Sequence, residues 1–392
     1  MSPAQPGRTG VTAAAGFEAA GVKGGLRSDG REDVALVRNL GPEFSAAGVF
    51  TSNRVFAAPV GWSRAAVADG RLVAVILNSG GANACTGDPG RQDTADTAAA
   101  VASTLDCGTT DVAVCSTGLI GVRLPMDKLL GAVPSAVEAL SNEGGAAAAG
   151  AIMTTDTVSK QASVTTDAGW TVGGMAKGAG MLAPALATML VVITTDAAVD
   201  PVELHSALKQ ATHVTFDRAD SDGCMSTNDT VLLLANGASG ITPSQADFTA
   251  ALTEVCRSLA VQLIADAEGA EHEVAIEVTS AATEDDAVEV ARAVARSNLF
   301  KCAIAGNDPN WGRVLAAVGT TQAAFEPERL DVSFNGVPVY VQGGLGADRS
   351  EVDLKPRQVH VQIALNAGDQ SATVWTNDLT HGYVSENADY PT

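Results

Sequence analysis

Basic side chains are scarce in this chain. Its 392 residues include 24 lysines and arginines against 45 aspartates and glutamates, which leaves a formal net charge of −21. So acidic a surface repels the phosphate backbone of nucleic acids and the headgroups of anionic membranes. We therefore expect neither a nucleic-acid partner nor a membrane partner. The charge carries no information about the fold.

Histidine and cysteine are also few, and neither is clustered. The five histidines are dispersed, and the six cysteines contain no C-x-x-C pair. No metal-ligand spacing results, so we expect no metal site. Most of the cysteines stand beside apolar residues, as in Val114-Cys115 and Val255-Cys256. This favours reduced core cysteines in a cytosolic protein over disulfides.

Long hydrophobic runs are missing as well. The first residues, 1–8, lack the apolar core of a signal peptide. The longest apolar run, residues 181–193, has Pro184 inside it and is too short to cross a bilayer. Because hydrophobic residues make up 46% of the chain and charged residues 18%, we expect a soluble, cytoplasmic globular protein with two structural halves.

Apolar periodicity predicts a mixture of helices and strands. Strands are predicted at 72–77, 112–115, 274–278, 332–334, 337–339, 359–363 and 372–375. Helices are predicted from about Pro125, from Ser244 to about 268, and from Thr283 to about 296, with a connection or weak helix over 142–150. Ser244 with Asp247 forms a capping signal, and Asn335-Gly336 between alternating apolar residues predicts a type I′ hairpin.

Thr188 is the most informative residue. It follows the glycine-rich run 173–180 and opens the apolar stretch 189–193. A small residue, a hydroxyl residue and then a buried strand is the arrangement of a chain that cuts itself. The hydroxyl attacks the preceding carbonyl, and the freed amine, with a reference pKa of about 7.7–8.0, then serves as its base. The same pattern is also typical of an ordinary strand, because β-branched threonine favours strands.

The glycine-rich run itself does not predict a nucleotide site. Residues 178–183 match G-x-G-x-x-A, but Pro184 and a strand follow where a dinucleotide site needs a helix. The run also lacks the G-K-[ST] ending of a phosphate loop. We interpret these glycines as positions where one backbone approaches another or turns sharply.

Four other features admit both a functional and a structural interpretation. Thr117-Gly118, after a buried strand, could offer a hydroxyl and a backbone N–H to an oxyanion, or form a turn. Glu268, near a helix C-terminus, could bind a cationic amine or remain a solvated carboxylate. The segment 307–313 is typical of a packed loop, and 226–230 of a turn into a strand.

Together these pieces resemble the ornithine acetyltransferases, also called glutamate N-acetyltransferases. The matching stretches are collinear and cover nearly the whole chain, and together they are far more specific than any one of them. They are 78–84, 115–121, 151–157, 177–184, 187–190, 226–230, 267–270, 308–313 and 383–387.

The resemblance implies self-cleavage between Ala187 and Thr188. The products are an α chain of residues 1–187 and a β chain of residues 188–392, which stay associated and typically pair as a dimer of αβ units. The implied fold class is α+β, an αββα sandwich that resembles the N-terminal-nucleophile hydrolases, with mixed sheets between helical layers.

The resemblance also implies the site. Thr188 carries the acetyl group, and Thr117 and Gly118 stabilise the oxyanion. Substrate contacts are implied for Thr154, Lys177, Thr188, Glu268, Asn387 and the C-terminal Thr392. Lys177 would face the α-carboxylate of N-acetylornithine, and Glu268 its δ-ammonium.

The implied reaction is a ping-pong transfer. N-acetylornithine acetylates Thr188, ornithine leaves, and glutamate enters to take the acetyl group as N-acetylglutamate. No cofactor is implied, although some family members accept acetyl-CoA as a second acetyl donor. Two alternatives stay open: an amidohydrolase or aminopeptidase that uses water as acceptor, and a binding module without catalysis.

Two positions bear on the family pattern. After Glu268-Gly269-Ala270 the family usually has Thr-Lys, whereas this chain has Glu271-His272. A positive charge is thereby lost and a carboxylate added near Glu268. At the tail, Thr392 keeps the hydroxyl residue that is usual there.

Overall fold

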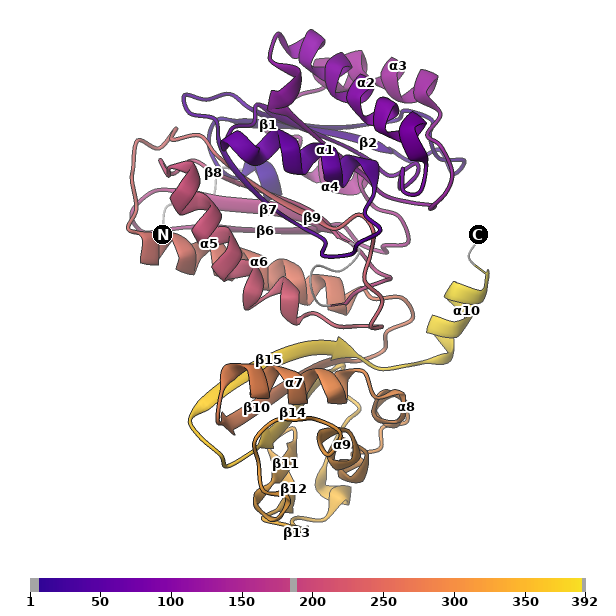
Figure 1. Cartoon of the computed structure of the whole chain (residues 1–392), viewed down its shortest axis with the longest axis vertical. Coiled ribbons are helices and arrows are strands. Elements are labelled where there is room, and N and C mark those ends of the chain that lie inside the picture. The colour runs from indigo at the N-terminus through magenta and orange to yellow at the C-terminus, as the bar shows by residue number, and fades with distance from the viewer. Residues whose placement is uncertain (1–6, 184–188, 390–392) are drawn as a thin grey trace. The chain divides into compact units, whose positions relative to one another are not determined.

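The computed structural model describes residues 7–183 and 189–389, which form two compact units (Figure 1). The larger unit consists of residues 1–179, 185–217 and 225–263, and the smaller unit of residues 180–184, 218–224 and 264–392. The boundary 187/188 does not separate these units. It falls in the connection between two neighbouring strands of the larger one.

The larger unit contains two β-sheets. One has the order β1-β2-β4-β5, and the other the order β3-β9-β8-β7-β6. The strands of the first are β1 (Phe17–Val22), β2 (Val34–Asn39), β4 (Ala74–Asn78) and β5 (Val112–Ser116). Those of the second are β3 (Ser45–Phe50), β6 (Lys160–Thr165), β7 (Thr171–Lys177), β8 (Leu190–Thr195) and β9 (Thr230–Ala235). Both sheets mix parallel and antiparallel pairs.

Helices cover the outer faces of both sheets. The helices α2 (Gly87–Leu105) and α3 (Met126–Glu138) share an apolar core with the four-stranded sheet. The helices α5 (Pro201–His213) and α6 (Gln245–Ala265) share another with the five-stranded sheet. A third core lies between the two sheets. The layer order is αββα (Figure 1), which confirms the predicted fold class.

Strand β8 shows why its apolar run is continuous rather than alternating. Val191 and Ile193 belong to the core under α5 and α6, whereas Leu190 and Val192 belong to the core between the sheets. A strand covered on both faces must be apolar at every position. The run 189–193 is therefore a central strand of the sandwich.

Two short helices flank the four-stranded sheet. In α1 (Ala58–Ala66), Trp62 Nε1 and Ser63 Oγ donate to the Val112 and Val114 carbonyls at 2.9 and 2.7 Å. These bonds occupy the outer edge of β5, which would otherwise expose unpaired backbone groups. The helix α4 (Gly145–Ala151) packs beside β1, and its residues Ala148, Ala149 and Ala151 belong to the core between the two sheets.

The smaller unit is a six-stranded sheet with helices on one face. Its order is β13-β12-β11-β14-β10-β15. The strands are β10 (Glu273–Ala281), β11 (Asp331–Phe334), β12 (Val337–Val341), β13 (Gly344–Leu345), β14 (Gln358–Ala364) and β15 (Gln370–Asn377). The helices are α7 (Glu284–Ala295), α8 (Asn298–Ala305), α9 (Trp311–Val318) and α10 (His381–Asp389), of which the first three join the apolar core.

Most local predictions are confirmed. Ser244 and Asp247 cap α6, and the Thr283 hydroxyl accepts from Asp286 N at the start of α7. The segment 142–150 contributes the helix α4. In the segment 307–313, Asn310 caps α9, Trp311 begins that helix and stacks on Tyr340, so the segment is a loop that runs into a packed helix.

The prediction about the cysteines is confirmed in one respect and wrong in another. All six are free thiols. Only Cys115 and Cys256 are buried, whereas Cys85, Cys224 and Cys302 are exposed and Cys107 is half-buried. An apolar neighbour in sequence did not predict burial, because the surroundings of a side chain in the fold depend on distant segments.

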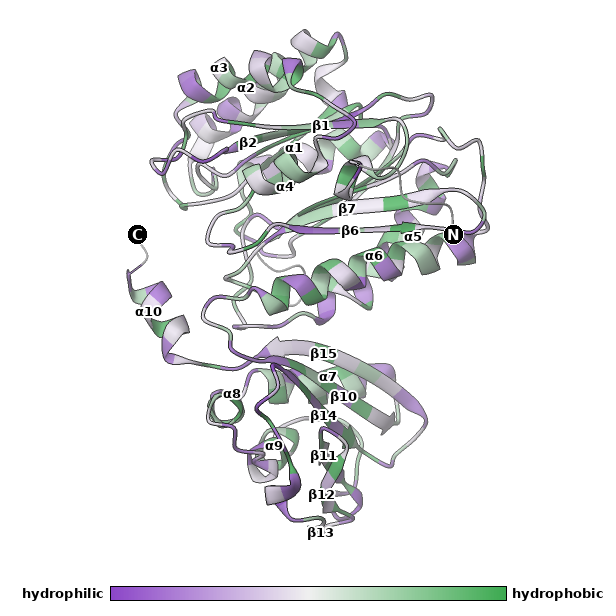
Figure 2. Ribbon diagram, turned by 180° about the vertical axis from the view of Figure 1, so that it is seen from behind, coloured by the Kyte–Doolittle hydropathy of each residue, from purple (hydrophilic) through white to green (hydrophobic). Residues whose placement is uncertain are grey.

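Among the described residues, α6 is long and apolar enough to cross a membrane by length and composition. Its apolar positions, however, are buried against the five-stranded sheet, with Phe248, Leu252, Val255 and Leu259 at most 1% exposed. In Figure 2 its ribbon alternates between hydrophobic and hydrophilic segments. It is therefore an amphipathic core helix.

Two glycines with open surroundings should respond oppositely to alanine. Gly336 has φ +82° in the hairpin between β11 and β12, and Gly131 lies within α3; a Cβ added at either meets no atom within 4 Å. We expect Gly336→Ala to cost about 1 kcal/mol through its left-handed backbone, and Gly131→Ala to stabilise by about 0.5–1 kcal/mol.

Urea unfolding measures both changes in a Thr188→Ala background, which we expect to remain one chain. A Gly336→Ala protein as stable as its parent would contradict the hairpin geometry.

Candidate functional site

The predicted site residues of the larger unit gather where its strands end or begin. Thr117 and Gly118 follow β5, and Lys177 is the last residue of β7. Strand β7 runs antiparallel to β8, so its last residue, Lys177, pairs with Leu190 at the beginning of β8. Because β8 and β9 are parallel, the beginning of β9 lies beside the same point.

Lys177 is the centre of this group. Its side chain is buried, and its Nζ lies 2.7 Å from Thr154 Oγ1 and 3.3 Å from Thr117 Oγ1. An ammonium group only donates hydrogen bonds, so both hydroxyl oxygens accept from it. The Thr117 hydroxyl keeps its own proton for another acceptor. This is the arrangement that an oxyanion donor requires.

Asp156 supplies the countercharge. Its carboxylate lies 2.7 Å from Lys160 Nζ and 3.8 Å from Lys177 Nζ, and all three side chains are buried. It also accepts the Gly178 and Thr154 N–H groups at 2.6 and 2.9 Å. Although burial alone would raise the pKa of Asp156, the two ammonium groups and these hydrogen bonds hold it well below its usual value.

Gly118 has a backbone that only glycine fits easily. Its φ is +129°, and a Cβ built on it would lie 2.9 Å from the Gly81 backbone. The Thr117 N–H is committed to the Asn78 carbonyl at 2.9 Å. Within the described parts of the chain, the Gly118 N–H has no recorded hydrogen-bond partner. The hydroxyl of Thr117 and the N–H of Gly118 are thus two adjacent donors that this loop can offer.

Asn228 and Asp229 border the same region, although sequence reasoning gave neither of them a role in the site. Asn228 Nδ2 donates to the carbonyls of Ala82 and Ser116 at 2.7 and 2.8 Å. Asp229 Oδ1 accepts the Met189 N–H at 3.1 Å. Burial raises the pKa of Asp229 well above its usual value, which favours the neutral carboxyl.

Sequence reasoning also missed Asp156 and Lys160. Asp156 lies inside the matching stretch 151–157, but a single carboxylate among small polar residues gives no sign of burial. The spacing of four residues between Asp156 and Lys160 was a weak signal of an ion pair.

The smaller unit holds two further predicted residues together. Asn387 Nδ2 of α10 donates to Glu268 Oε2 at 2.9 Å. A Cβ on Gly180 would lie 2.6 Å from both carboxylate oxygens of Glu268, so this glycine permits the close approach. The segment that follows Gly180 is tied to this unit as well, because Asp222 Oδ2 accepts the Met181 N–H at 2.8 Å.

Three predicted residues, Ala187, Thr188 and Thr392, lie outside the described ranges. Glu271 and His272, which stand where the family usually has Thr-Lys, lie within the described ranges. His272 is buried, with Nδ1 2.7 Å from Asp378 Oδ2 and Nε2 3.0 Å from the Leu354 carbonyl. The side chain of His272 therefore packs within the smaller unit, and Glu271 is exposed.

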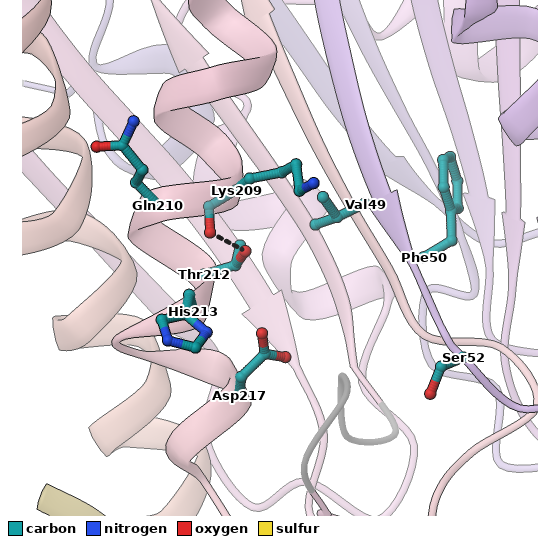
Figure 3. Close-up of a pocket in the computed structure, with 8 residues that line it drawn as sticks. All are labelled: Val49, Phe50, Ser52, Lys209, Gln210, Thr212, His213 and Asp217. Carbon is teal, nitrogen blue, oxygen red and sulfur yellow. Dashed lines mark hydrogen bonds between the residues drawn. The ribbon is translucent and has the colours of Figure 1, made fainter. Parts of the chain in front are cut away.

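A surface hollow of about 420 Å³ lies elsewhere in the larger unit, between the end of β3 and α5 (Figure 3). Its lining includes Val49, Lys209 and His213, and none of the predicted site residues. Among the described residues, no cluster of three or more histidines, cysteines and carboxylates suitable for a metal ion occurs.

A hydroxyl, a buried ammonium and a glycine N–H gathered at the strand ends of an αββα sandwich are the parts of an acyl-transferring enzyme. The model of the ArgJ family matches residues 18–392. The chain therefore belongs to the ArgJ family.

Its relatives agree over almost their full length. The arginine biosynthesis bifunctional protein ArgJ of Streptomyces avermitilis is 63% identical over 97% of this chain and 99% of its own. The protein of the same name from Mycolicibacterium paratuberculosis is 58% identical over 97% of this chain and 96% of its own.

Two solved structures are also similar. The ornithine acetyltransferase of Mycobacterium tuberculosis, complexed with ornithine, is 55% identical and covers 47% of this chain and 98% of its own, with a TM-score of 0.45. The ArgJ protein of Bacillus halodurans is 34% identical and covers 50% of this chain and 97% of its own, with a TM-score of 0.48.

The buried cluster predicts a large, pH-dependent cost for Asp156→Asn. The substitution leaves two buried ammonium groups without their carboxylate, which should cost about 3–5 kcal/mol at pH 7. Because the folded pKa of Asp156 is lowered, its contribution is present above the unfolded pKa of about 3.9 and is lost as the pH falls below it.

Urea unfolding of the Thr188→Ala chain between pH 7 and pH 3 measures this difference. Asp33→Asn is the matched control, since buried Asp33 accepts backbone N–H groups of Gly24, Leu26 and Arg27. A deficit that equals the control, or that does not shrink toward pH 3, would refute the role of the ion pair.

Proposed function

We propose that this protein transfers the acetyl group of N-acetylornithine to glutamate in arginine biosynthesis, through an acetyl ester on Thr188. Family membership and curated relatives named for arginine biosynthesis support the pathway. The observation that carries the proposal is the contact of the buried Lys177 ammonium with the hydroxyls of Thr117 and Thr154. It joins an oxyanion donor to a binding site for an anion.

The first half-reaction assigns a task to each group. Thr188 Oγ1 attacks the acetyl carbonyl while its own α-amine takes the hydroxyl proton. The Thr117 hydroxyl and the Gly118 N–H stabilise the oxyanion, and one such donor is typically worth about 2.7–4 kcal/mol of the barrier. The proton passes to the leaving amine, and ornithine departs.

Both amino acids share the features that Lys177 would recognise. N-acetylornithine and glutamate each carry an α-carboxylate, which Lys177 with Thr154 would bind. The side chains differ in charge, since ornithine carries an ammonium and glutamate a carboxylate. Glu268, held by Asn387, suits the ammonium of ornithine. We place Thr392 among the substrate contacts as well.

Cleavage between Ala187 and Thr188 would divide the five-stranded sheet between two chains. Strands β3, β6 and β7 would belong to the α chain, and β8 and β9 to the β chain. The order β3-β9-β8-β7-β6 interleaves them, so each chain would hold the other through two strand pairs. This supports α and β chains that stay associated; we further propose a dimer of such αβ units.

Two further parts of the proposal concern a second acetyl donor and the location of the protein. Acetyl-CoA is proposed as a second acetyl donor, with no other cofactor, and the location as the cytoplasm.

The competing function is hydrolysis, in which water replaces glutamate. Acetate release from N-acetylornithine that glutamate leaves unchanged would favour the hydrolase.

Thr188→Ala tests cleavage and transfer together. The wild-type protein should give two bands on a denaturing gel and, after N-acetylornithine, one additional acetyl group on the β chain by intact mass spectrometry. The variant should remain a single unacetylated chain without activity, because it lacks the nucleophile. Thr188→Ser, which keeps a hydroxyl, is the control and should still cleave. Acetyl transfer by Thr188→Ala would refute the proposal.

Glu268→Gln should separate the two half-reactions. In a ping-pong scheme, kcat/KM for each substrate reports on its own half-reaction. Losing a charged partner of the ornithine ammonium should lower kcat/KM for N-acetylornithine about 10–100-fold. The value for glutamate should change less than about 3-fold, since glutamate has no ammonium side chain.

Glu271→Gln removes an exposed carboxylate three residues away and should change neither value. An equal fall for both substrates of Glu268→Gln would contradict the assignment of Glu268 to ornithine.

A further inference from the structure

The dipeptide Asn228-Asp229 immediately precedes β9, and its two side chains contact different parts of the site. Both are buried, at 5% and 0% exposed. The proposed mechanism gives neither of them a task. Their contacts nevertheless reach both the loop that carries the oxyanion donors and the strand that follows the nucleophile.

Asn228 uses both N–H groups of its amide on the side of the oxyanion loop. Its Nδ2 carries two N–H groups, and these donate to the carbonyls of Ala82 and Ser116 at 2.7 and 2.8 Å. Its Oδ1 accepts the hydroxyl of Thr227 at 2.6 Å, which orients the amide. One side chain thus joins the loop of Ala82 to the end of β5.

The contact to Ser116 bears directly on Thr117. The Ser116 carbonyl and the Thr117 N–H belong to one planar peptide group. Asn228 binds its oxygen, and the Asn78 carbonyl accepts its N–H at 2.9 Å. With both ends held, this peptide group sets the position of the Thr117 backbone.

Asp229 acts in the same way on the other side. Its Oδ1 accepts the Met189 N–H at 3.1 Å, and that N–H belongs to the peptide group joining Met189 to residue 188. The Met189 carbonyl accepts the Thr230 N–H at 3.1 Å. The carboxyl therefore binds the N–H group just before β8, at the point where the ladder between β8 and β9 begins.

We infer that Asn228-Asp229 is a positioning pair that sets the oxyanion loop against the strand of the nucleophile. Because the two residues are adjacent, one short piece of backbone relates the Ser116-Thr117 peptide group to the peptide group that follows residue 188. After cleavage, this piece lies in the β chain and Thr117 in the α chain, so the pair also aligns the two chains. The inference rests on the proposed function, since it names what holds that same site.

The distance between the oxyanion donors and the nucleophile must be set accurately for acetyl transfer. An oxyanion donor acts at about 2.7–3.1 Å from the oxyanion. A displacement of about 1 Å can cost about 100-fold in rate. Neither residue is proposed to touch substrate, so its loss should lower kcat and leave KM nearly unchanged.

The opposite ends of the same two strands supply matched controls. Asn236 follows β9, is buried, donates to the Ala15 carbonyl at 2.8 Å and accepts the Ala238 N–H at 2.9 Å. Asp196 follows β8, is buried, and accepts the Thr171 and Ala15 N–H groups at 2.7 and 3.0 Å. Both pairs lose comparable hydrogen bonds on substitution, but only one pair borders the site.

The experiment compares Asn228→Ala and Asp229→Ala with Asn236→Ala and Asp196→Ala in the full-length protein. The fraction cleaved is measured first, and kcat and KM for N-acetylornithine are then determined per cleaved chain. We expect Asn228→Ala and Asp229→Ala to lower kcat about 100-fold with KM within about 3-fold. The two controls should lose stability and keep kcat within about 3-fold.

Two isosteric variants test the hydrogen bonds themselves. Asn228→Asp keeps the shape but, when ionised, cannot donate to two carbonyls, so it should be as impaired as Asn228→Ala. Asp229→Asn keeps an oxygen that accepts the Met189 N–H and should recover at least about tenfold over Asp229→Ala. An Asn228→Asp protein with wild-type kcat, or site variants no worse than their controls, would overturn the inference.

Hydrogen exchange gives a measurement independent of activity. Amides of residues 117–121 should exchange faster in Asn228→Ala than in wild type, and not in Asn236→Ala. If the wild-type protein showed no acetyl transfer, that result would reject the proposed function but not the positioning pair. Unchanged exchange in Asn228→Ala would reject the positioning pair, whatever reaction the protein catalyses.

Discussion

The buried Lys177 ammonium is the constraint around which the site is built. A buried ammonium needs partners, because an unpaired charge in the interior is very costly. Asp156 supplies the countercharge, and the hydroxyls of Thr117 and Thr154 take its hydrogen bonds. In the proposed reaction, the same charge would attract an α-carboxylate and orient the Thr117 hydroxyl so that its proton is available. Both proposed tasks, substrate binding and oxyanion stabilisation, would therefore depend on one group.

The αββα sandwich explains how residues far apart in sequence reach this group. Lys177 ends β7, Thr117 follows β5 of the other sheet, and Met189 and Asp229 stand before β8 and β9. Alternating strand directions bring these termini to one side of the larger unit. Short side chains then complete the connections. Asn228 links the start of β9 to the end of β5, and Asp229 links it to the residue before β8.

Features that depend on near neighbours were predictable. The cap at Ser244, the cap at Thr283 and the Asn335-Gly336 hairpin all rest on contacts within a few residues. Thr117, Gly118, Thr154 and Lys177 were named from family resemblance, and the structure brings them together. Asp156 and Asn228 were missed as site residues, because nothing in a short polar segment reveals which distant backbone its side chains will meet.

Local apolar spacing was enough to predict several helices and strands, among them α6, α7 and the strands β10 and β14, and collinear motifs were enough to identify the family. Both follow from short-range rules that act within a few residues. The burial of Lys160, Asp156 and Lys177, the exposure of three of the cysteines and the two tasks of Asn228-Asp229 depend instead on how the sheets stack. Only tertiary packing brings such distant groups within hydrogen-bond distance and removes the water between them.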